Sequence, residues 1–111
     1  MTEGTCRIVR AIRAVPPGRV SCYRDIALAA GFPNGARQVV RVLHTLTDKE
    51  KLPWHRIIRA DGFIALPREE GGLLQARLLR AEGVRVSRRA GPKPSPSGLW
   101  VDLKRYGFFS E

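Results

Sequence analysis

A five-residue turn signal between two short helical patterns is the feature that most constrains the fold of this chain. Residues 31–35 read Gly-Phe-Pro-Asn-Gly, and a cluster of glycine, proline and asparagine ends one regular element before another starts. We expect a helix over residues 23–30, with Ser21 placed to cap its start, and a second helix over residues 36–46. Two helices joined by so short a turn form the helix-turn-helix pattern.

The second helix of this pair has one apolar and one basic face. Its apolar positions follow the spacing of a buried stripe: Val39, Val42, Leu43 and Leu46. A different face carries three basic side chains at i, i+4 and i+7: Arg37, Arg41 and His44. Helix-turn-helix proteins place such a face on DNA, although two packed helices of any small α domain can show the same pattern.

Further helices are expected on both sides of this pair. Residues 5–15 have apolar positions at helical spacing, and Pro16-Pro17-Gly18 stops that helix. Residues 48–52 have the composition of a charged loop. A last core helix is expected over residues 72–82, with three side chains on its inward stripe: Leu74, Leu78 and Ala81.

The remaining segments predict a wing and a returning C-terminus. Asp61-Gly62 is a strong hairpin-turn signal between the short apolar pairs Ile57-Ile58 and Phe63-Ile64. Residues 88–98 are basic and rich in proline and serine, which is typical of a mobile segment. Residues 99–111 are apolar enough to pack back on the core.

The sequence therefore predicts a mainly α fold, namely a small helix-turn-helix or winged-helix domain with a short β-hairpin wing. A chain of 111 residues is expected to be one domain, spanning residues 1–111 with its core at about 5–85. Hydrophobic residues make up 43% of it, which is enough to build a core.

The charge of the chain favours a nucleic-acid partner. The formal net charge is +10, and 16 of the 20 basic residues are arginine. Guanidinium groups suit bidentate contacts with phosphate and stacking on bases. A solvated basic surface, ribosome binding or an acidic protein partner would also fit the charge alone.

Other function classes receive little support. Two cysteines, Cys6 and Cys22, do not make a disulfide framework, and the two histidines show no metal-ligand spacing, so we expect neither a metal nor another cofactor. No apolar run approaches the roughly 20 residues of a membrane span, and the first residues do not resemble a signal peptide. We expect a cytoplasmic monomer, associated with the nucleoid if the source is bacterial.

Several motifs together resemble one known family, the O6-alkylguanine-DNA alkyltransferases. The strongest is Pro53-Trp54-His55-Arg56-Ile57-Ile58, which is similar to the family's active-site motif Pro-Cys-His-Arg-Val. Further matches occur in the family's order over residues 8–83: Pro17-Gly18-Arg19-Val20-Ser21-Cys22-Tyr23, Gly35-Ala36-Arg37-Gln38-Val39, Asp61-Gly62, and Leu78-Leu79 with Glu82-Gly83.

One residue separates this chain from the enzymes of that family. In the alkyltransferases the cysteine of the motif accepts the alkyl group from the damaged base, and Trp54 stands in its place here. Indole has no nucleophile comparable to a thiolate. The chain therefore resembles the alkyltransferase-like proteins, which recognise the lesion in DNA without repairing it.

The resemblance implies a role in DNA binding for four residues. Arg37 would enter the base stack through the minor groove and fill the gap left by an extruded base, because extrusion costs a few kcal/mol of stacking and pairing. Tyr23 would press on the 3′ phosphate and help to rotate the nucleotide out. Arg41 and Ser21 belong to the same expected DNA-binding surface.

The resemblance also implies a lesion pocket and its support. Trp54, with Pro53 and His55, would line the pocket and pack on the alkylguanine, since stacking on an aromatic ring contributes about 1–3 kcal/mol per base. His55 and Glu82 match the residues that activate the thiol in the enzymes. Without the thiol we interpret them as structural, and we expect Arg56 to support the loop from behind.

Two positions depart from the family pattern. The alkyltransferases brace the active-site loop with an asparagine in the preceding turn, and Leu46 stands at that spacing here. Alkyltransferase-like proteins tend to place a basic side chain near the guanine O6 edge. Pro67 falls at about that position with Arg68 next to it, so Arg68 is our candidate probe of O6.

These residues lead to one main hypothesis and two alternatives. The main hypothesis is a non-enzymatic protein that binds duplex DNA, flips O6-alkylguanine and marks it for nucleotide excision repair proteins. The first alternative is an alkyltransferase that uses Cys22 or Cys6. The second is an ordinary winged-helix regulator that reads bases in the major groove.

Overall fold

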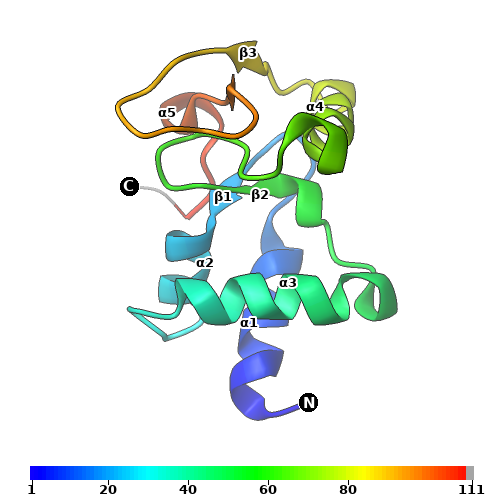
Figure 1. Cartoon of the computed structure of the whole chain (residues 1–111). Coiled ribbons are helices and arrows are strands. Elements are labelled where there is room, and N and C mark those ends of the chain that lie inside the picture. Colours follow the sequence, from blue (N-terminus) through cyan, green and yellow to red (C-terminus); the bar gives the residue numbers. More distant parts are fainter. Residues whose placement is uncertain (110–111) are drawn as a thin grey trace.

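The computed structural model describes residues 1–109, and Figure 1 shows the course of the chain. The α-helices are α1 (Glu3–Ala14), α2 (Tyr23–Ala29), α3 (Ala36–Glu50), α4 (Gly72–Ala81) and α5 (Leu103–Tyr106). Two short 3₁₀ helices follow α3, namely η1 (Trp54–Arg56) and η2 (Arg68–Glu70). The strands are β1 (Ser21–Cys22), β2 (Ile57–Ile58), β3 (Ser87–Arg88) and β4 (Leu99–Trp100). The mainly helical fold predicted from the sequence is confirmed.

Helices α1, α2 and α3 form one layer around the first of two apolar clusters. Thr2 caps α1, where its hydroxyl accepts a hydrogen bond from the Thr5 amide at 3.1 Å. Helix α3 runs across α1 and beside α2 (Figure 1). The inward faces of the three helices supply most of the buried side chains of this cluster, which include Ile8, Ile12, Val15, Ile26, Val39 and Val42. The predicted stripe of α3 is therefore inward, although Leu43 and Leu46 are only partly buried.

A second apolar cluster joins the middle of the chain to its C-terminal part. It contains Ile58 and Ile64 from the central segment, Leu79 from α4, and Leu99 and Val101 from the returning chain. The amide of Val20 donates to the Tyr106 carbonyl at 2.9 Å, and the Phe108 amide donates to the Val20 carbonyl at 2.7 Å. The expected packing of the C-terminal segment is confirmed up to Phe108. Phe109 is 41% exposed, and residues 110–111 of that prediction lie outside the described residues.

The predicted β-hairpin wing is wrong in its pairing. Strand β2 pairs in parallel with β1, with Ser21 opposite Ile57 and Cys22 opposite Ile58. Asp61-Gly62 does form a turn, since the Gly62 amide donates to the Arg59 carbonyl at 3.0 Å, but Phe63 bridges to Trp100. Gly62 has φ +92°, and a Cβ there would lie 2.5 Å from the Val101 carbonyl oxygen. The C-terminal segment thus pairs with Phe63-Ile64 in place of the first strand of the expected hairpin, and β1 pairs with that first strand in place of the second.

Two further local predictions need correction. Helix α3 continues through residues 48–50, because lysine and glutamate favour helices as well as loops, and Glu50 in its last turn pairs with Arg13 of α1 at 3.0 Å. In α4 the inward stripe is displaced: Leu74 is 48% exposed, and Gln75, Ala76 and Leu79 are buried. The polar Gln75 turns inward because its amide has two backbone partners there, which apolar periodicity does not reveal.

Residues 88–98, expected to be mobile, are attached to the core at several points in the structure. The Arg59 guanidinium donates to the Pro94 carbonyl at 3.0 Å, and the buried Ser97 hydroxyl donates to the Ile64 carbonyl at 2.8 Å. Of the helices within residues 1–109, none combines the length and apolar character needed to cross a membrane. The same residues contain no group of three or more potential metal ligands.

Candidate nucleic-acid interface

A cavity of about 410 Å³ opens between α2, α3 and η1. Tyr23 lies at the start of α2, and Trp54 begins η1, so the structure brings these two predicted site residues to one cavity. The lining is mainly apolar, with a smaller number of polar groups, as is usual for a site that binds a small organic group. The remaining lining residues are Val40, Leu43, His44, Thr47, Asp48, Ile57, Leu66 and Gln75.

Helix α3 supplies the longest wall of this cavity and carries the basic face along its edge. Arg37 and Arg41 are exposed on α3, and neither forms an ion pair with another residue of the described range 1–109. Arg37, Arg41, His44 and Asp48 succeed one another at three- to four-residue spacing, so they share one side of the helix. His44 and Asp48 line the cavity, so Arg37 and Arg41, which lie on the same side of α3, lie along the edge of that cavity.

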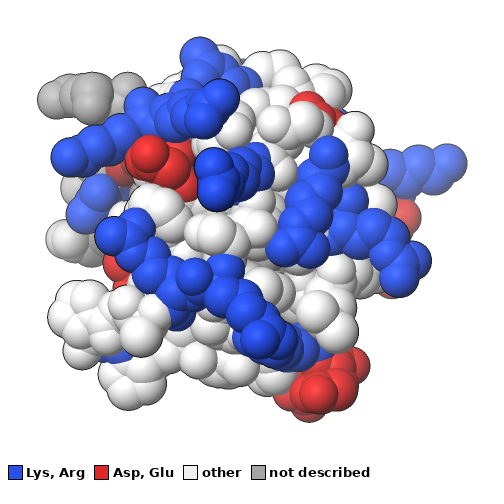
Figure 2. Space-filling view, turned by 90° about the horizontal axis from the view of Figure 1, so that it is seen from above, with Lys and Arg blue, Asp and Glu red and all other residues white. Residues whose placement is uncertain are grey.

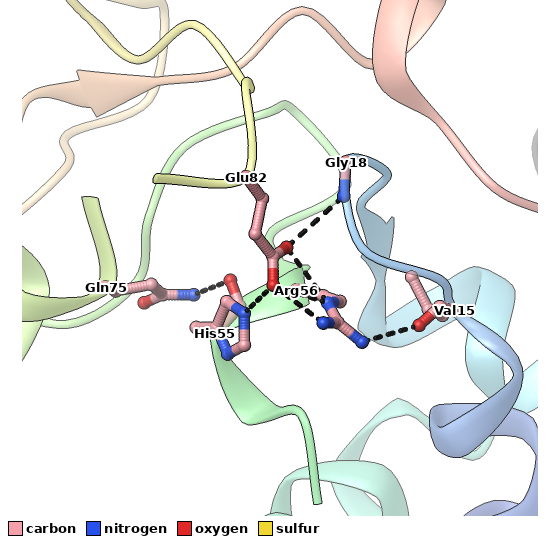
Figure 3. A network of polar contacts seen from close by, with 6 residues as sticks. All are labelled: Val15, Gly18, His55, Arg56, Gln75 and Glu82. Atoms are coloured by element: carbon pink, nitrogen blue, oxygen red, sulfur yellow. Dashed lines mark hydrogen bonds and ion pairs between the residues drawn. The ribbon is translucent and has the colours of Figure 1, made fainter. Parts of the chain in front are cut away.

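Gln75 of α4 fixes the backbone that carries Trp54. Its side-chain amide donates to the carbonyls of His55 and Ile57, both at 3.0 Å, and the residue is only 2% exposed. The amide therefore holds the cavity wall from the side of α4 (Figure 3). Sequence reasoning missed Gln75, since a single polar residue within an apolar stripe gives no sign of its partners. Leu46, which we compared with a bracing asparagine, packs instead against the first apolar cluster.

Glu82 is the centre of a polar network behind Trp54, drawn in Figure 3. Arg56 donates to the Glu82 carboxylate from Nε at 3.0 Å and from Nη2 at 2.6 Å. His55 donates from Nε2 at 2.9 Å, because an ionised carboxylate can only accept, and the Gly18 amide donates at 3.3 Å. Arg56 Nη1 also reaches the Val15 carbonyl at 3.0 Å, so the network joins α1, η1 and the end of α4.

The ionisation of two groups follows from their surroundings. Hydrogen bonds from Arg56 and, to a smaller extent, from His55 and Gly18 lower the pKa of Glu82 from 4.5 to about 2, against the opposing effect of burial. The carboxylate is therefore charged at neutral pH. Burial raises the pKa of the Tyr23 phenol, so its hydroxyl stays protonated and can donate a hydrogen bond.

The cysteines lie outside this site. Burial raises the pKa of the Cys22 thiol, and the side chain is fully buried in β1. Cys6 lies in α1 and, like Cys22, does not line the cavity. A buried thiol with a raised pKa has little thiolate at neutral pH and is a poor nucleophile.

Three other residues selected from the sequence differ in how deeply they are buried. Ser21 is 1% exposed, and its Oγ is the one buried side-chain oxygen or nitrogen without a hydrogen-bond partner among residues 1–109. The predicted cap at Ser21 is wrong, and the side chain is turned away from the surface because residues 21–22 pair with β2. Pro53 precedes η1, is partly buried and, like His55, does not line the cavity, contrary to the expectation from the sequence. Arg68 donates from Nε to the Ser97 carbonyl at 2.7 Å and does not line the cavity.

Positive charge extends well beyond α3. Figure 2 shows the face at the top of Figure 1, where α4 and β3 lie, and basic side chains gather across it with few acidic ones between them. The exposed basic residues on α4, β3 and the connected segments include Arg77, Arg80, Arg85, Arg88, Arg89 and Lys93. A surface of this kind attracts a polyanion.

Comparison with known proteins defines the class of this protein. Residues 4–84 match the family described as "6-O-methylguanine DNA methyltransferase, DNA binding domain", and the chain belongs to that family. Among its relatives are proteins named as base-flipping and alkyltransferase-like. The "DNA base-flipping protein" of Escherichia coli K12 is 40% identical over 100 residues, which are 90% of this chain and 70% of that protein.

Two further comparisons lead to the alkyltransferase-like members. "Alkyltransferase-like protein 1" of Schizosaccharomyces pombe is 34% identical over 87 residues, covering 78% of this chain and 81% of that protein. The crystal structure of S. pombe Atl1 in complex with damaged DNA containing O6-carboxymethylguanine superposes with a TM-score of 0.81 at 30% identity. That match covers 97% of this chain and 96% of the Atl1 chain. The family resemblance and the fold expected from the sequence are both confirmed.

Proposed function

We propose that this protein recognises O6-alkylguanine in duplex DNA and holds the flipped base in the cavity between α2, α3 and η1 without removing the alkyl group. The observation that carries the proposal is the position of Trp54. Trp54 lines the cavity. We interpret it as standing in the place of the alkyl-accepting cysteine of the family motif, and an indole can stack on a base but cannot accept its alkyl group.

The proposed steps follow from the charges and shape of the site. Phosphate contacts from the basic surface bring the duplex to α3, and Arg37 enters the stack as the base leaves it. Tyr23 supports the rotated nucleotide with its protonated hydroxyl. The alkylated guanine then packs on Trp54, whose backbone is held in place by Gln75 and by the network around Glu82.

The two alternative functions receive less support from the site. Cys22 is buried and its thiol pKa is raised, so a transferase that used it would need both exposure and ionisation. An ordinary winged-helix regulator would not require an apolar cavity beside its recognition helix. The proposal includes a monomer in the cytoplasm, at the nucleoid if the source is bacterial, that marks the lesion for nucleotide excision repair proteins.

The proposal is tested with two short duplexes that differ only by O6-methylguanine in place of guanine, at physiological salt. We expect tighter binding to the methylated duplex and an unchanged intact mass of the protein afterwards. Equal binding to both duplexes would exclude lesion recognition. A gain of one methyl group in the protein would show that it does transfer the alkyl group from the base.

A matched pair of variants tests the flipping step. Arg37→Ala removes the proposed finger on α3, whereas Arg77→Ala removes an exposed arginine of α4 that does not line the cavity. We expect Arg37→Ala to reduce the preference for the methylated duplex, and Arg77→Ala to leave that preference unchanged. Equal effects of the two variants would contradict base flipping by Arg37.

A further inference from the structure

A second cavity, of about 270 Å³, lies between β3, β4 and α5. Its lining consists of Arg85, Ser87, Trp100, Asp102, Arg105 and Tyr106. None of these residues lines the cavity beside α3. In Figure 1 the elements that form it lie at the end of the molecule opposite α1 and α3, so a duplex held on α3 leaves this cavity accessible.

The arginines of this second cavity are available to bind an anion. Arg85 and Arg105 are exposed, and neither forms an ion pair within residues 1–109. The Asp102 carboxylate caps α5, accepting from the Lys104 amide at 3.0 Å through Oδ1. Two arginines and one aspartate, whose carboxylate already has a backbone partner, therefore line the same cavity.

The aromatic lining is held in place rather than free to turn. Trp100 donates from Nε1 to the Asp61 carbonyl at 2.9 Å, and the Arg89 guanidinium lies 4.0 Å from the Trp100 ring centroid. The Arg105 guanidinium lies 5.2 Å from the Tyr106 ring centroid. Fixed aromatic rings among arginines are the combination with which proteins bind single-stranded nucleic acids, where bases stack on rings and phosphates contact guanidinium groups.

We propose that this cavity binds an unpaired nucleotide of a nucleic-acid strand. Arg85 and Arg105 contact the phosphate, and the base lies against Trp100 and Tyr106 with its amino or imino N–H donated to Asp102. A base inside a duplex has its faces and its pairing edge occupied, so the aromatic rings and Asp102 favour an unpaired one. The protein would then have two nucleic-acid sites, one for the lesion on α3 and one for a single strand at the other end.

Asp102 distinguishes a nucleotide from an acidic peptide as the occupant. The carboxylates of such a peptide only accept hydrogen bonds, and Asp102 in the same cavity would repel them. A nucleotide offers both an anionic phosphate for the arginines and N–H donors for the carboxylate. The basic side chains that gather on the face in Figure 2 would provide further phosphate contacts for the strand.

The test uses the full chain with Trp54→Phe, which leaves Trp100 as its only tryptophan. A short oligodeoxycytidine is titrated while Trp100 emission is recorded, and we expect the emission to change on binding. Adding Arg85→Ala and Arg105→Ala should weaken binding about tenfold or more. It should also reduce the slope of log affinity against log salt by about 0.7, because the two arginines contact one phosphate and each single-strand phosphate contributes about 0.7.

A control variant and two competitors make the result decisive. Arg10→Ala with Arg24→Ala removes the same number of exposed arginines from α1 and α2, away from the cavity and from the basic face, and should retain the oligonucleotide affinity. With Trp54 intact, Arg85→Ala with Arg105→Ala should keep the preference for methylated over unmodified duplex. Equal losses in the two double variants would overturn the proposal. A short undamaged duplex or an oligoglutamate peptide that displaced the oligonucleotide equally well from the cavity would also overturn it.

Discussion

Replacing Glu82 by alanine should destabilise the fold strongly, because this carboxylate neutralises a largely buried guanidinium. The Arg56 and Glu82 side chains are only 15% and 18% exposed. Removing one partner of a fully buried ion pair costs about 3–5 kcal/mol, whereas exposed pairs contribute about 0–1 kcal/mol. Since these side chains are mostly but not fully buried, we expect Glu82→Ala to lower the free energy of unfolding by about 2–3 kcal/mol.

The pKa of Glu82 gives a second route to the same magnitude. A shift from 4.5 to about 2 corresponds to about 3 kcal/mol at 1.36 kcal/mol per unit, and partial exposure to solvent reduces this to about 2 kcal/mol. Because the folded-state pKa is depressed, the contribution is complete above pH 4.5 and is lost as the pH falls towards about 2. The difference in stability between the native chain and Glu82→Ala should therefore be constant near neutral pH and shrink in acid.

Urea unfolding at several pH values measures this difference. Glu69→Ala is the matched control, because Glu69 is exposed in η2 and forms no ion pair within residues 1–109. We expect the control to unfold within about 0.5 kcal/mol of the native chain at all pH values. A Glu82→Ala effect below about 1 kcal/mol at neutral pH, or one that grows on acidification, would refute the buried-pair reasoning.

Three further changes have defined outcomes. Trp54→Ala should weaken binding to the methylated duplex by about 1–3 kcal/mol with little effect on unmodified duplex, as measured by fluorescence anisotropy of labelled DNA; equal losses on both duplexes would argue against stacking at Trp54. Gln75→Leu leaves the carbonyls of His55 and Ile57 without their donor, so thermal unfolding should show a loss of about 1–3 kcal/mol, and an unchanged melting temperature would contradict this. Gly62→Ala places a Cβ 2.5 Å from the Val101 carbonyl oxygen at a backbone φ of +92°. Urea unfolding should therefore show that the free energy of unfolding falls by more than about 1 kcal/mol, roughly the cost of a strained φ. An unchanged free energy of unfolding would show that this position does not require glycine.

Patterns that depend on one segment were predicted well from the sequence. The turn at residues 31–35 and the inward positions Val39 and Val42 follow from local punctuation and helical period, and both are present in the structure. The turn at Asp61-Gly62 also forms. The partner of β2 was predicted wrongly, because the sequence of a two-residue strand does not indicate which distant segment pairs with it.

Residues of the site could be predicted from the sequence only where a side chain carries a distinctive chemistry. Trp54 and Tyr23 were selected for their chemistry and meet in one cavity. Gln75 was not selected, since its role depends on two carbonyl groups that reach it only in the folded chain. Ser21 was misplaced for the same reason: its local pattern suits a helix cap, but pairing with β2 buries it.

The contact between His55 and Glu82 has a structural explanation that requires no catalytic role. Glu82 also accepts hydrogen bonds from Arg56 and Gly18, and Arg56 continues to the Val15 carbonyl. These bonds join the end of α1, η1 and the end of α4, so the carboxylate would be required even if no proton were ever transferred. A neutral side chain at position 82 would leave the Arg56 charge without its partner. The network is therefore explained by the architecture that holds Trp54 at the cavity wall.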